Sequence, residues 1–189
     1  MIIFMGVAGA GKSVQGRMLA EKLGYDWIST GELLRKNIHG DRKQEMLEGK
    51  LLGDDEIIAI VEDRLKVLSS NNRAILDGFP RTLPQAKWLL KQHTKETLSI
   101  NGVVHLTASK EVVKQRLLQR GRPDDSEEAI DVRFNEYEEH TLPIVDWFKE
   151  SGLTVYEIDG ERDVNEIHHE IVNQLNPKAG KEPINALTN

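Results

Sequence analysis

Residues 6–13 combine types and a spacing that suit the binding of phosphate groups. They read Gly-Val-Ala-Gly-Ala-Gly-Lys-Ser, a complete G-x-x-x-x-G-K-[ST] phosphate loop. The glycines let backbone N–H groups curl around phosphate oxygens, and a helix that follows directly adds the positive end of its dipole. In this motif Lys12 reaches the β- and γ-phosphates and the Ser13 hydroxyl sits near Mg²⁺. The loop therefore predicts that the chain binds a nucleoside triphosphate, and it leaves open which group receives the phosphate.

Asp77 is a second candidate for phosphate chemistry. It follows the apolar run 74–76 and precedes Gly-Phe-Pro-Arg-Thr. An acidic residue at the carboxyl end of a buried strand beside a phosphate loop suits a Walker-B role, in which it holds Mg²⁺ through water. Asp-Gly is also a common turn, but the upstream phosphate loop favours the functional interpretation. Ser13 and Asp77 are thus the predicted metal-side residues.

Arginine side chains form the third group of candidates. Arg116 and Arg120 are spaced to share one helix face. The other candidates lie in segments that we expect to converge at the carboxyl edge of the sheet: Arg35, Arg81, Arg122 and Arg133. A single such arginine is most often a solvated surface residue, but this chain is acidic overall, with a net charge of −6. Gathered guanidinium groups suit a transferring phosphoryl group whose equatorial oxygens carry the charge.

Short apolar runs alternate with amphipathic segments, and these elements must position the candidates. The predicted strands are 2–5, 26–28, 74–76, 103–106 and 155–158. The predicted helices are 12–23, 30–39, 41–48, 54–69, 83–92, 109–120, 126–150 and 163–175, with Thr30 and Asp54 as helix caps. This alternation is typical of an α/β fold with a parallel sheet covered by helices. Consecutive helices after residue 30 predict an inserted subdomain, residues 120–126 a polar break, and residues 176–189 a mobile tail.

Composition narrows the class of protein. The chain has 189 residues, of which 39% are hydrophobic and 30% charged, as in an ordinary globular domain. No run approaches the ~20 apolar residues of a membrane span, and the first apolar stretch has no basic region before it, so we expect neither a membrane partner nor a signal peptide. The absence of cysteine excludes disulfides and thiolate zinc sites. The acidic charge disfavours nucleic acid as a partner, and the cytoplasm is the expected location.

Four further segments make the chain resemble an adenylate kinase of the nucleoside monophosphate kinase family. Residues 29–35, Ser-Thr-Gly-Glu-Leu-Leu-Arg, resemble the family's S-T-G-D-L-L-R segment, and residues 49–52 resemble G-x-L-V. Residues 77–86 are similar to D-G-F-P-R-T-x-x-Q-A. The family's lid hinge and the helix after it have similar residues in this chain, which are Arg122-Pro123-Asp124-Asp125, Arg133, Tyr137, Thr141 and Pro143. The resemblance runs from Met1 to about Leu175.

The resemblance implies the reaction ATP + AMP ⇌ 2 ADP with Mg²⁺, and it implies a role for each matching residue. The catalytic residues would be Lys12, Arg81, Arg120, Arg122 and Arg133. ATP would lie on Gly6, Gly9, Ala10, Gly11, Lys12, Ser13, Val14, Arg116 and Arg120, with Arg116 stacked on the base. AMP would lie on Thr30, Gly31, Arg35, Leu51, Leu52, Gly78, Arg81 and Gln85. Within that set, Thr30 and Gln85 would face the adenine, and Arg35 and Arg81 would grip the phosphate.

The same resemblance implies a P-loop NTPase architecture and a monomer. It predicts a three-layer α/β/α domain over residues 1–175, with a five-stranded parallel sheet. A helical monophosphate-binding insertion would occupy residues 30–68, and a very short lid residues 120–126. The lid leaves no room for the cysteine-ligated zinc of some long-lid members. Ser13-Val14 stands where the family usually has Gly-Thr, which moves the metal-facing hydroxyl back by one residue.

Three other functions remain as alternatives. A UMP/CMP kinase shares the phosphate loop, but such relatives tend to have Ala at position 30 and a different pattern between Arg81 and Gln85. A kinase of sugar-like alcohols would need a general base, for which Asp77 could serve, but it leaves the AMP-site motifs unexplained. A nucleotide-dependent switch would be expected to carry N-K-x-D or D-x-x-G, which the chain lacks. A monophosphate acceptor is already largely dianionic at neutral pH, so the favoured reaction needs no general base.

Overall fold

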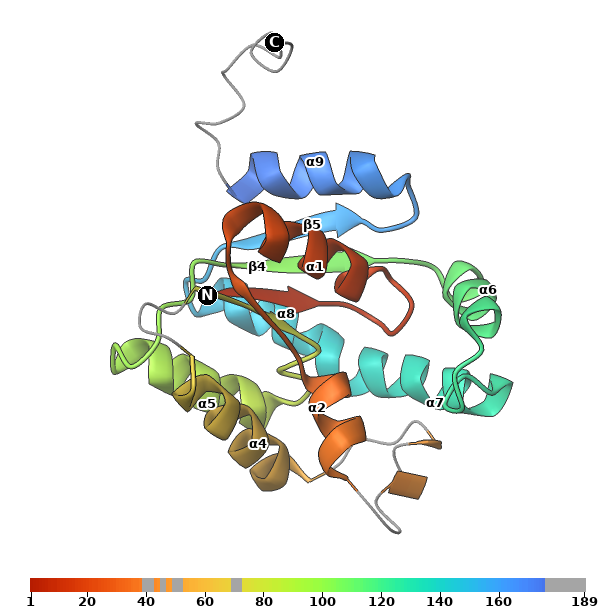
Figure 1. Ribbon diagram of the computed structural model, residues 1–189, viewed down its shortest axis with the longest axis horizontal. Helices are drawn as coiled ribbons and strands as arrows, with labels where there is room; N and C mark the ends of the chain where they lie inside the picture. Colours follow the sequence, from red (N-terminus) through yellow and green to blue (C-terminus); the bar gives the residue numbers. More distant parts are fainter. Residues whose placement is uncertain (39–42, 45–46, 49–52, 69–72, 176–189) are drawn as a thin grey trace, which may run out of the picture.

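The fold is built on a five-stranded parallel sheet in the order β2-β3-β1-β4-β5 (Figure 1). The computed structural model describes residues 1–38, 43–44, 47–48, 53–68 and 73–175. The strands are β1 (Ile2–Met5), β2 (Asp26–Ser29), β3 (Ala74–Asp77), β4 (Gly102–Thr107) and β5 (Val155–Asp159). Every neighbouring pair is parallel, so all five strands point their carboxyl ends to the same edge. The predicted parallel sheet is confirmed, and each predicted strand differs from the observed one by at most a residue at either end.

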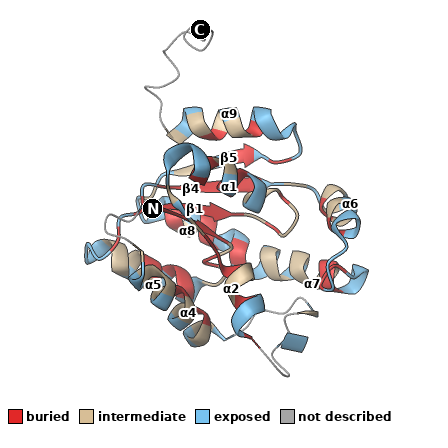
Figure 2. Ribbon diagram, in the orientation of Figure 1, coloured by how far each residue is buried: buried red, intermediate tan, exposed pale blue. Residues whose placement is uncertain are grey.

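Strand β1 lies at the centre of the sheet and is buried along its whole length (Figure 2). Its side chains alternate between two hydrophobic cores, because successive residues of a strand point to opposite faces. Ile2 and Phe4 pack into one core, and Ile3 and Met5 into the other. A strand covered on both faces reads as a continuous apolar run rather than as an alternating one, which is why its sequence is Ile-Ile-Phe-Met. The phosphate loop is therefore attached to a strand that is enclosed along its whole length.

Helices cover both faces of the sheet and complete a three-layer domain (Figure 1). They are α1 (Lys12–Leu23), α2 (Thr30–Asn37), α4 (Asp54–Lys66), α5 (Leu83–Thr94), α6 (Lys110–Arg120), α7 (Glu127–Glu136), α8 (Leu142–Glu150) and α9 (Val164–Leu175). Helices α1 and α9 share the core of Ile2 and Phe4, whereas α4, α5 and α8 share that of Ile3 and Met5. No helix in the described part of the chain is long and apolar enough to cross a membrane.

Two expected helix caps are wrong. Helix α2 begins at Thr30, but its cap is Ser29, whose hydroxyl accepts a hydrogen bond from the Glu32 amide at 3.4 Å. Helix α4 is preceded by Gly53 rather than capped by Asp54. The oxygen atoms of both predicted caps bond to residues outside their own helices instead, as described below. The helix predicted over 41–48 is described only at residues 43–44 and 47–48, and the predicted tail 176–189 lies outside the described residues.

The single helix predicted over 126–150 is also wrong, because a π-helical turn divides it. This turn, η1, spans Tyr137–Thr141 between α7 and α8, and the Leu142 amide donates to the Tyr137 carbonyl. Pro143 follows directly. Proline has no N–H to give an α-helix, and its ring crowds the carbonyl of the preceding turn. A widened turn at this point accommodates both effects.

Candidate active site

A cavity of about 450 Å³ lies at the carboxyl edge of the sheet, where the phosphate loop leaves β1. Chain segments from both halves of the sheet line it, since β1 has β3 on one side and β4 on the other. In open parallel sheets this reversal of strand order is where ligands bind. The structure brings nearly all described candidates to its wall. The exception is Ala10, whose side chain is buried and does not line the cavity. The candidates Leu51 and Leu52 lie outside the described residues.

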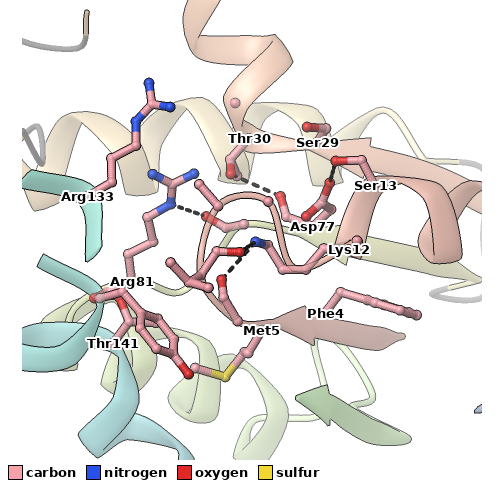
Figure 3. Close-up of a pocket in the computed structure, with 18 of the residues that line it drawn as sticks. Phe4, Met5, Lys12, Ser13, Ser29, Thr30, Asp77, Arg81, Arg133 and Thr141 are labelled. Atoms are coloured by element: carbon pink, nitrogen blue, oxygen red, sulfur yellow. Dashed lines mark hydrogen bonds between the residues drawn. The ribbon is translucent and has the colours of Figure 1, made fainter. Parts of the chain in front are cut away.

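The phosphate loop is shaped by glycine where no other residue fits. Gly6 has a φ of +136°, and a Cβ built there would lie 2.2 Å from the Leu106 carbonyl oxygen. Lys12 folds its ammonium back onto the loop and donates to the carbonyls of Gly6 and Val7, each at 2.7 Å (Figure 3). Burial lowers the pKa of Lys12 to about 8, although Asp77 opposes the shift. The ammonium thus lacks full compensation within the protein, which suits it to an anionic ligand.

Asp77 joins the phosphate loop to the start of α2. Its Oδ2 accepts a hydrogen bond from the Ser13 hydroxyl at 2.6 Å, and its carbonyl accepts one from Thr30 Oγ1 at 3.0 Å (Figure 3). The predicted pair of metal-side residues is therefore in direct contact. Gly78 follows with a φ of +80°, and a Cβ there would lie 2.9 Å from Thr30 Oγ1. Val14 lines the same wall with half of its surface exposed and offers no oxygen.

Arg81 and Gln85 belong to one hydrogen-bonded corner of the cavity. Arg81 Nε donates to the Gly78 carbonyl at 2.9 Å, and the Arg81 amide donates to Gln85 Oε1 at 2.8 Å. Gln85 Nε2 in turn donates to Asp54 Oδ1 at 2.8 Å, and Thr82 Oγ1 donates to the same oxygen at 2.5 Å. Asp54 therefore anchors α4 to the start of α5, which explains why it does not cap its own helix. Burial lowers the pKa of Arg81, and the nearby Arg133 adds to the shift.

Two buried aspartates hold Arg120 and Arg133 in place. Asp125 accepts from Arg120 Nε at 2.8 Å and from Arg120 Nη2 at 2.6 Å, and Arg133 Nη1 lies 3.4 Å away. Arg133 also donates to Asp124, which is 5% exposed. Burial alone would raise the pKa of Asp125, but the bonds from Arg120 and from the Arg122 amide outweigh it and hold the pKa below its usual value. The carboxylates thus fix guanidinium groups that would otherwise repel one another.

This holding role was not predicted, because Asp124 and Asp125 stand out in the sequence only as part of a motif. A usable signal was present: two consecutive acids stand in a break between two helices that both carry candidate arginines. Arg35 also approaches Asp124, with 4.0 Å between Arg35 Nη1 and Asp124 Oδ2. Arg122 lines the cavity with an exposed side chain.

Arg116 bridges the phosphate loop to the loop after β5. Its Nη1 donates to the carbonyl of Gly160 at 2.8 Å and lies 3.5 Å from that of Gly9. The backbones approach so closely that a Cβ on Gly160 would lie 2.6 Å from the Ala10 carbonyl oxygen. Arg116 therefore joins the phosphate loop to the loop after β5 at one side of the cavity.

The charge of the cavity is opposite to that of the chain. Its described wall carries the cations Lys12, Arg35, Arg81, Arg116, Arg120, Arg122, Arg133 and Arg162. The acids on the same wall are Asp77, Asp124 and Glu136. A surplus of cations in a chain of net charge −6 focuses positive potential on one place. Such a site suits a ligand with several phosphate groups.

Comparison with known proteins agrees with this geometry. A family model described as "Adenylate kinase" matches residues 4–153. An adenylate kinase of Corynebacterium aurimucosum is 39% identical over 172 residues, which cover 88% of this chain and 93% of that protein. One of Corynebacterium glutamicum is 38% identical, covering 88% and 94%. One of Prochlorococcus marinus is 37% identical, covering 92% and 97%.

Proposed function

This chain belongs to the adenylate kinase family, and we propose how its own residues carry out the reaction ATP + AMP ⇌ 2 ADP. The observation that carries the proposal is the placement of Lys12 on one wall, with Arg81 and Arg133 on another, around a single cavity (Figure 3). Lys12 leaves the loop carbonyls to bind the β- and γ-phosphates of ATP. Arg35 and Arg81 hold the phosphate of AMP.

Transfer itself needs no protein base. An oxygen of the dianionic AMP phosphate attacks the γ-phosphorus of ATP, and the bond from that phosphorus to the β-phosphate oxygen breaks. Both products are ADP, and no proton has to move. Arg120, Arg122 and Arg133 stabilise the charge spread over the equatorial oxygens of the group in flight. Because the guanidinium groups of Arg120 and Arg133 are already held by Asp124 and Asp125, these two need little reorganisation at the moment of reaction.

Ser13 and Asp77 fit the magnesium ion that this reaction uses. A hydroxyl and a carboxylate oxygen lie 2.6 Å apart at the end of the loop, and Mg²⁺ prefers oxygen ligands of this kind. Bound there, Mg²⁺ would neutralise charge on the triphosphate. Ser13 performs no capping that would compete with this role, because the cap of α1 is Gly11.

We expect Ser13→Ala to raise the Mg²⁺ requirement about tenfold, in line with the cost of losing a residue that orients a metal. Val14→Thr is the matched control and should leave the requirement unchanged, since Ser13 already supplies the metal-side hydroxyl in the proposed site. The measurement is a magnesium titration of ATP affinity by calorimetry, repeated on turnover. An unaltered midpoint in Ser13→Ala would remove Ser13 from the metal site.

The choice of acceptor is the experiment that tests the proposed function. We expect ADP to form from ATP and AMP far faster than CMP or UMP is phosphorylated, and Gln85→Ala to erode that preference about tenfold by leaving the base edge unread. The ratio of kcat/KM values is the readout, because loss of the Gln85 bond to the Arg81 amide would slow every acceptor alike. A wild-type protein that prefers CMP or UMP would overturn the AMP assignment.

The division into parts is also proposed. Residues 30–68 would bind the monophosphate, and residues 120–126 would serve as the lid. The placement of Thr30 and Arg35 in the cavity wall supports the first, and the arginines held by Asp124 and Asp125 support the second. We propose a cytoplasmic monomer without nucleic-acid or membrane partners, which fractionation and analytical ultracentrifugation of the full chain would check.

A further inference from the structure

His105 is a buried polar residue beneath the cavity with no part in the phosphoryl transfer described above. It lies on β4 beside Met5 of β1 and is 2% exposed. Its Nε2 lies 2.7 Å from Tyr137 Oη. Its Nδ1 faces Glu157 Oε1 of β5 at 3.8 Å, and Glu157 is held by Lys149 of α8. Tyr137 lines the cavity, so the imidazole is connected to the site through one phenol.

Neighbouring groups determine that Tyr137 donates, and His105 accepts, the hydrogen bond between them. The Glu157 carboxylate favours a proton on Nδ1 of His105, which leaves Nε2 as an acceptor. Burial raises the pKa of Tyr137 to about 12, so the phenol keeps its proton and donates it to Nε2. Burial also lowers the pKa of His105, with Glu157 opposing and Lys149 and Lys12 adding to the shift. The imidazole is therefore neutral at pH 7.

Tyr137 stands at a structural junction between two of the site arginines. It begins the π-helical turn η1, and its backbone N–H donates to the Arg133 carbonyl. Thr141, at the far end of the same turn, donates from Oγ1 to the Arg81 carbonyl at 2.8 Å. A π-helical turn is rare and occurs mostly at functional sites, where a shift in its register would move everything attached to it. The Tyr137 hydroxyl is placed to hold that register.

We propose that His105 is a positioning residue that accepts a hydrogen bond from the Tyr137 hydroxyl, fixes η1, and thereby sets Arg133 beside the transferring phosphoryl group, whereas the Arg81 guanidinium is fixed separately by the Gly78 carbonyl. The inference rests on the proposed function. His105 itself touches no substrate. A misplacement of about 1 Å at reacting groups costs about 10²-fold in rate. The effect falls on kcat rather than on KM, because Arg133 acts mainly on charge that develops in the transition state.

Substitutions separate this role from simple packing. We expect His105→Leu and Tyr137→Phe each to lower kcat between 10- and 100-fold with KM for both nucleotides changed less than threefold. The double variant should be no slower than either single one. His105→Gln, whose Oε1 can accept in place of Nε2, should restore kcat to within about fivefold of wild type. Val104→Ala, on the opposite face of β4, controls for destabilisation and should keep its kcat. Additive losses, or a His105→Gln variant as slow as His105→Leu, would overturn the proposal.

A titration independent of activity closes the test. Proton NMR of His105 in the intact protein should show its pKa rising in Tyr137→Phe, because the lost donor favoured the neutral imidazole. An unchanged or lower pKa contradicts the proposed bond. A wild-type protein that makes no ADP would instead refute the proposed function while leaving this titration interpretable. At low pH the AMP phosphate, whose second pKa is about 6, gains a proton, and kcat falls equally in all variants. Comparing each variant with wild type at the same pH removes this shared effect.

Discussion

Lys12→Met should lose about 10³-fold or more in phosphoryl transfer while remaining fully folded. One preorganised donor at a developing charge contributes about 10²- to 10³-fold, and in the proposed mechanism Lys12 serves two phosphates at once. Turnover is measured as ADP formation from ATP and AMP at saturating nucleotide. Near-normal transfer by the folded variant would remove Lys12 from the reaction.

The stability of the same variant should rise rather than fall. The pKa of Lys12 is about 8 in the folded protein and 10.5 in an unfolded chain. The unfolded chain therefore binds the proton more tightly, and holding the ammonium costs folding free energy below pH 8, a cost that disappears as the pH rises from 8 to 10.5. The cost at pH 7 is at most about 3 kcal/mol. We expect Lys12→Met to be more stable than wild type at pH 7 and no more stable above pH 10.5, as measured by urea unfolding at both pH values.

Replacement of Arg133 should give the second large effect. Arg133→Ala is expected to lower kcat by about 10³-fold, the low end for an arginine that stabilises a phosphoryl group in flight, and Arg120→Ala should act in the same direction. Arg81→Ala should instead act chiefly on the KM for AMP, because we propose that Arg81 holds the acceptor phosphate. Arg17→Ala is the matched control, since Arg17 is 59% exposed and pairs with Glu32 away from the cavity wall.

Steady-state kinetics with each nucleotide varied in turn separates these roles. The division fails if Arg81, Arg120 and Arg133 variants all show one small rise in KM with kcat unchanged. It also fails if Arg17→Ala slows transfer as much as the others do.

The strands and the phosphate loop follow from the sequence because local signals and burial agree there. The run before Gly6 is apolar throughout, and the glycines at 6 and 78 sit where a side chain would strike backbone or a hydroxyl. The widened turn at 137–141 was not predicted, although Pro143 was a visible obstacle to an α-helix. A helical pattern of hydrophobic residues on both sides of a proline does not predict which backbone conformation joins the two helical segments.

The misassigned caps have a different origin. Thr30 and Asp54 have the right residue types for a helix start, but partners distant in sequence claim their oxygens. Asp124 and Asp125 look solvated in sequence, and they are buried because Arg120 and Arg133 arrive from two helices to neutralise them. His105 and Tyr137 could not be paired from sequence at all, since nothing local connects a strand to a turn that lies 32 residues further along the chain.

The enclosure of β1 has a consequence for how the protein opens. Amide hydrogens of Ile2–Met5 can exchange with solvent only when the whole sheet comes apart, whereas helices with few buried residues exchange through local opening. Helix α2 buries Thr30 and Leu34, and α4 buries Ile57 and Val61. The proposed active site therefore spans two levels of stability. Helices α2 and α4, on the proposed monophosphate side, can open locally and release the nucleotide without unfolding the sheet. Strand β1, which carries the phosphate loop, keeps its protection from deuterium exchange throughout the catalytic cycle.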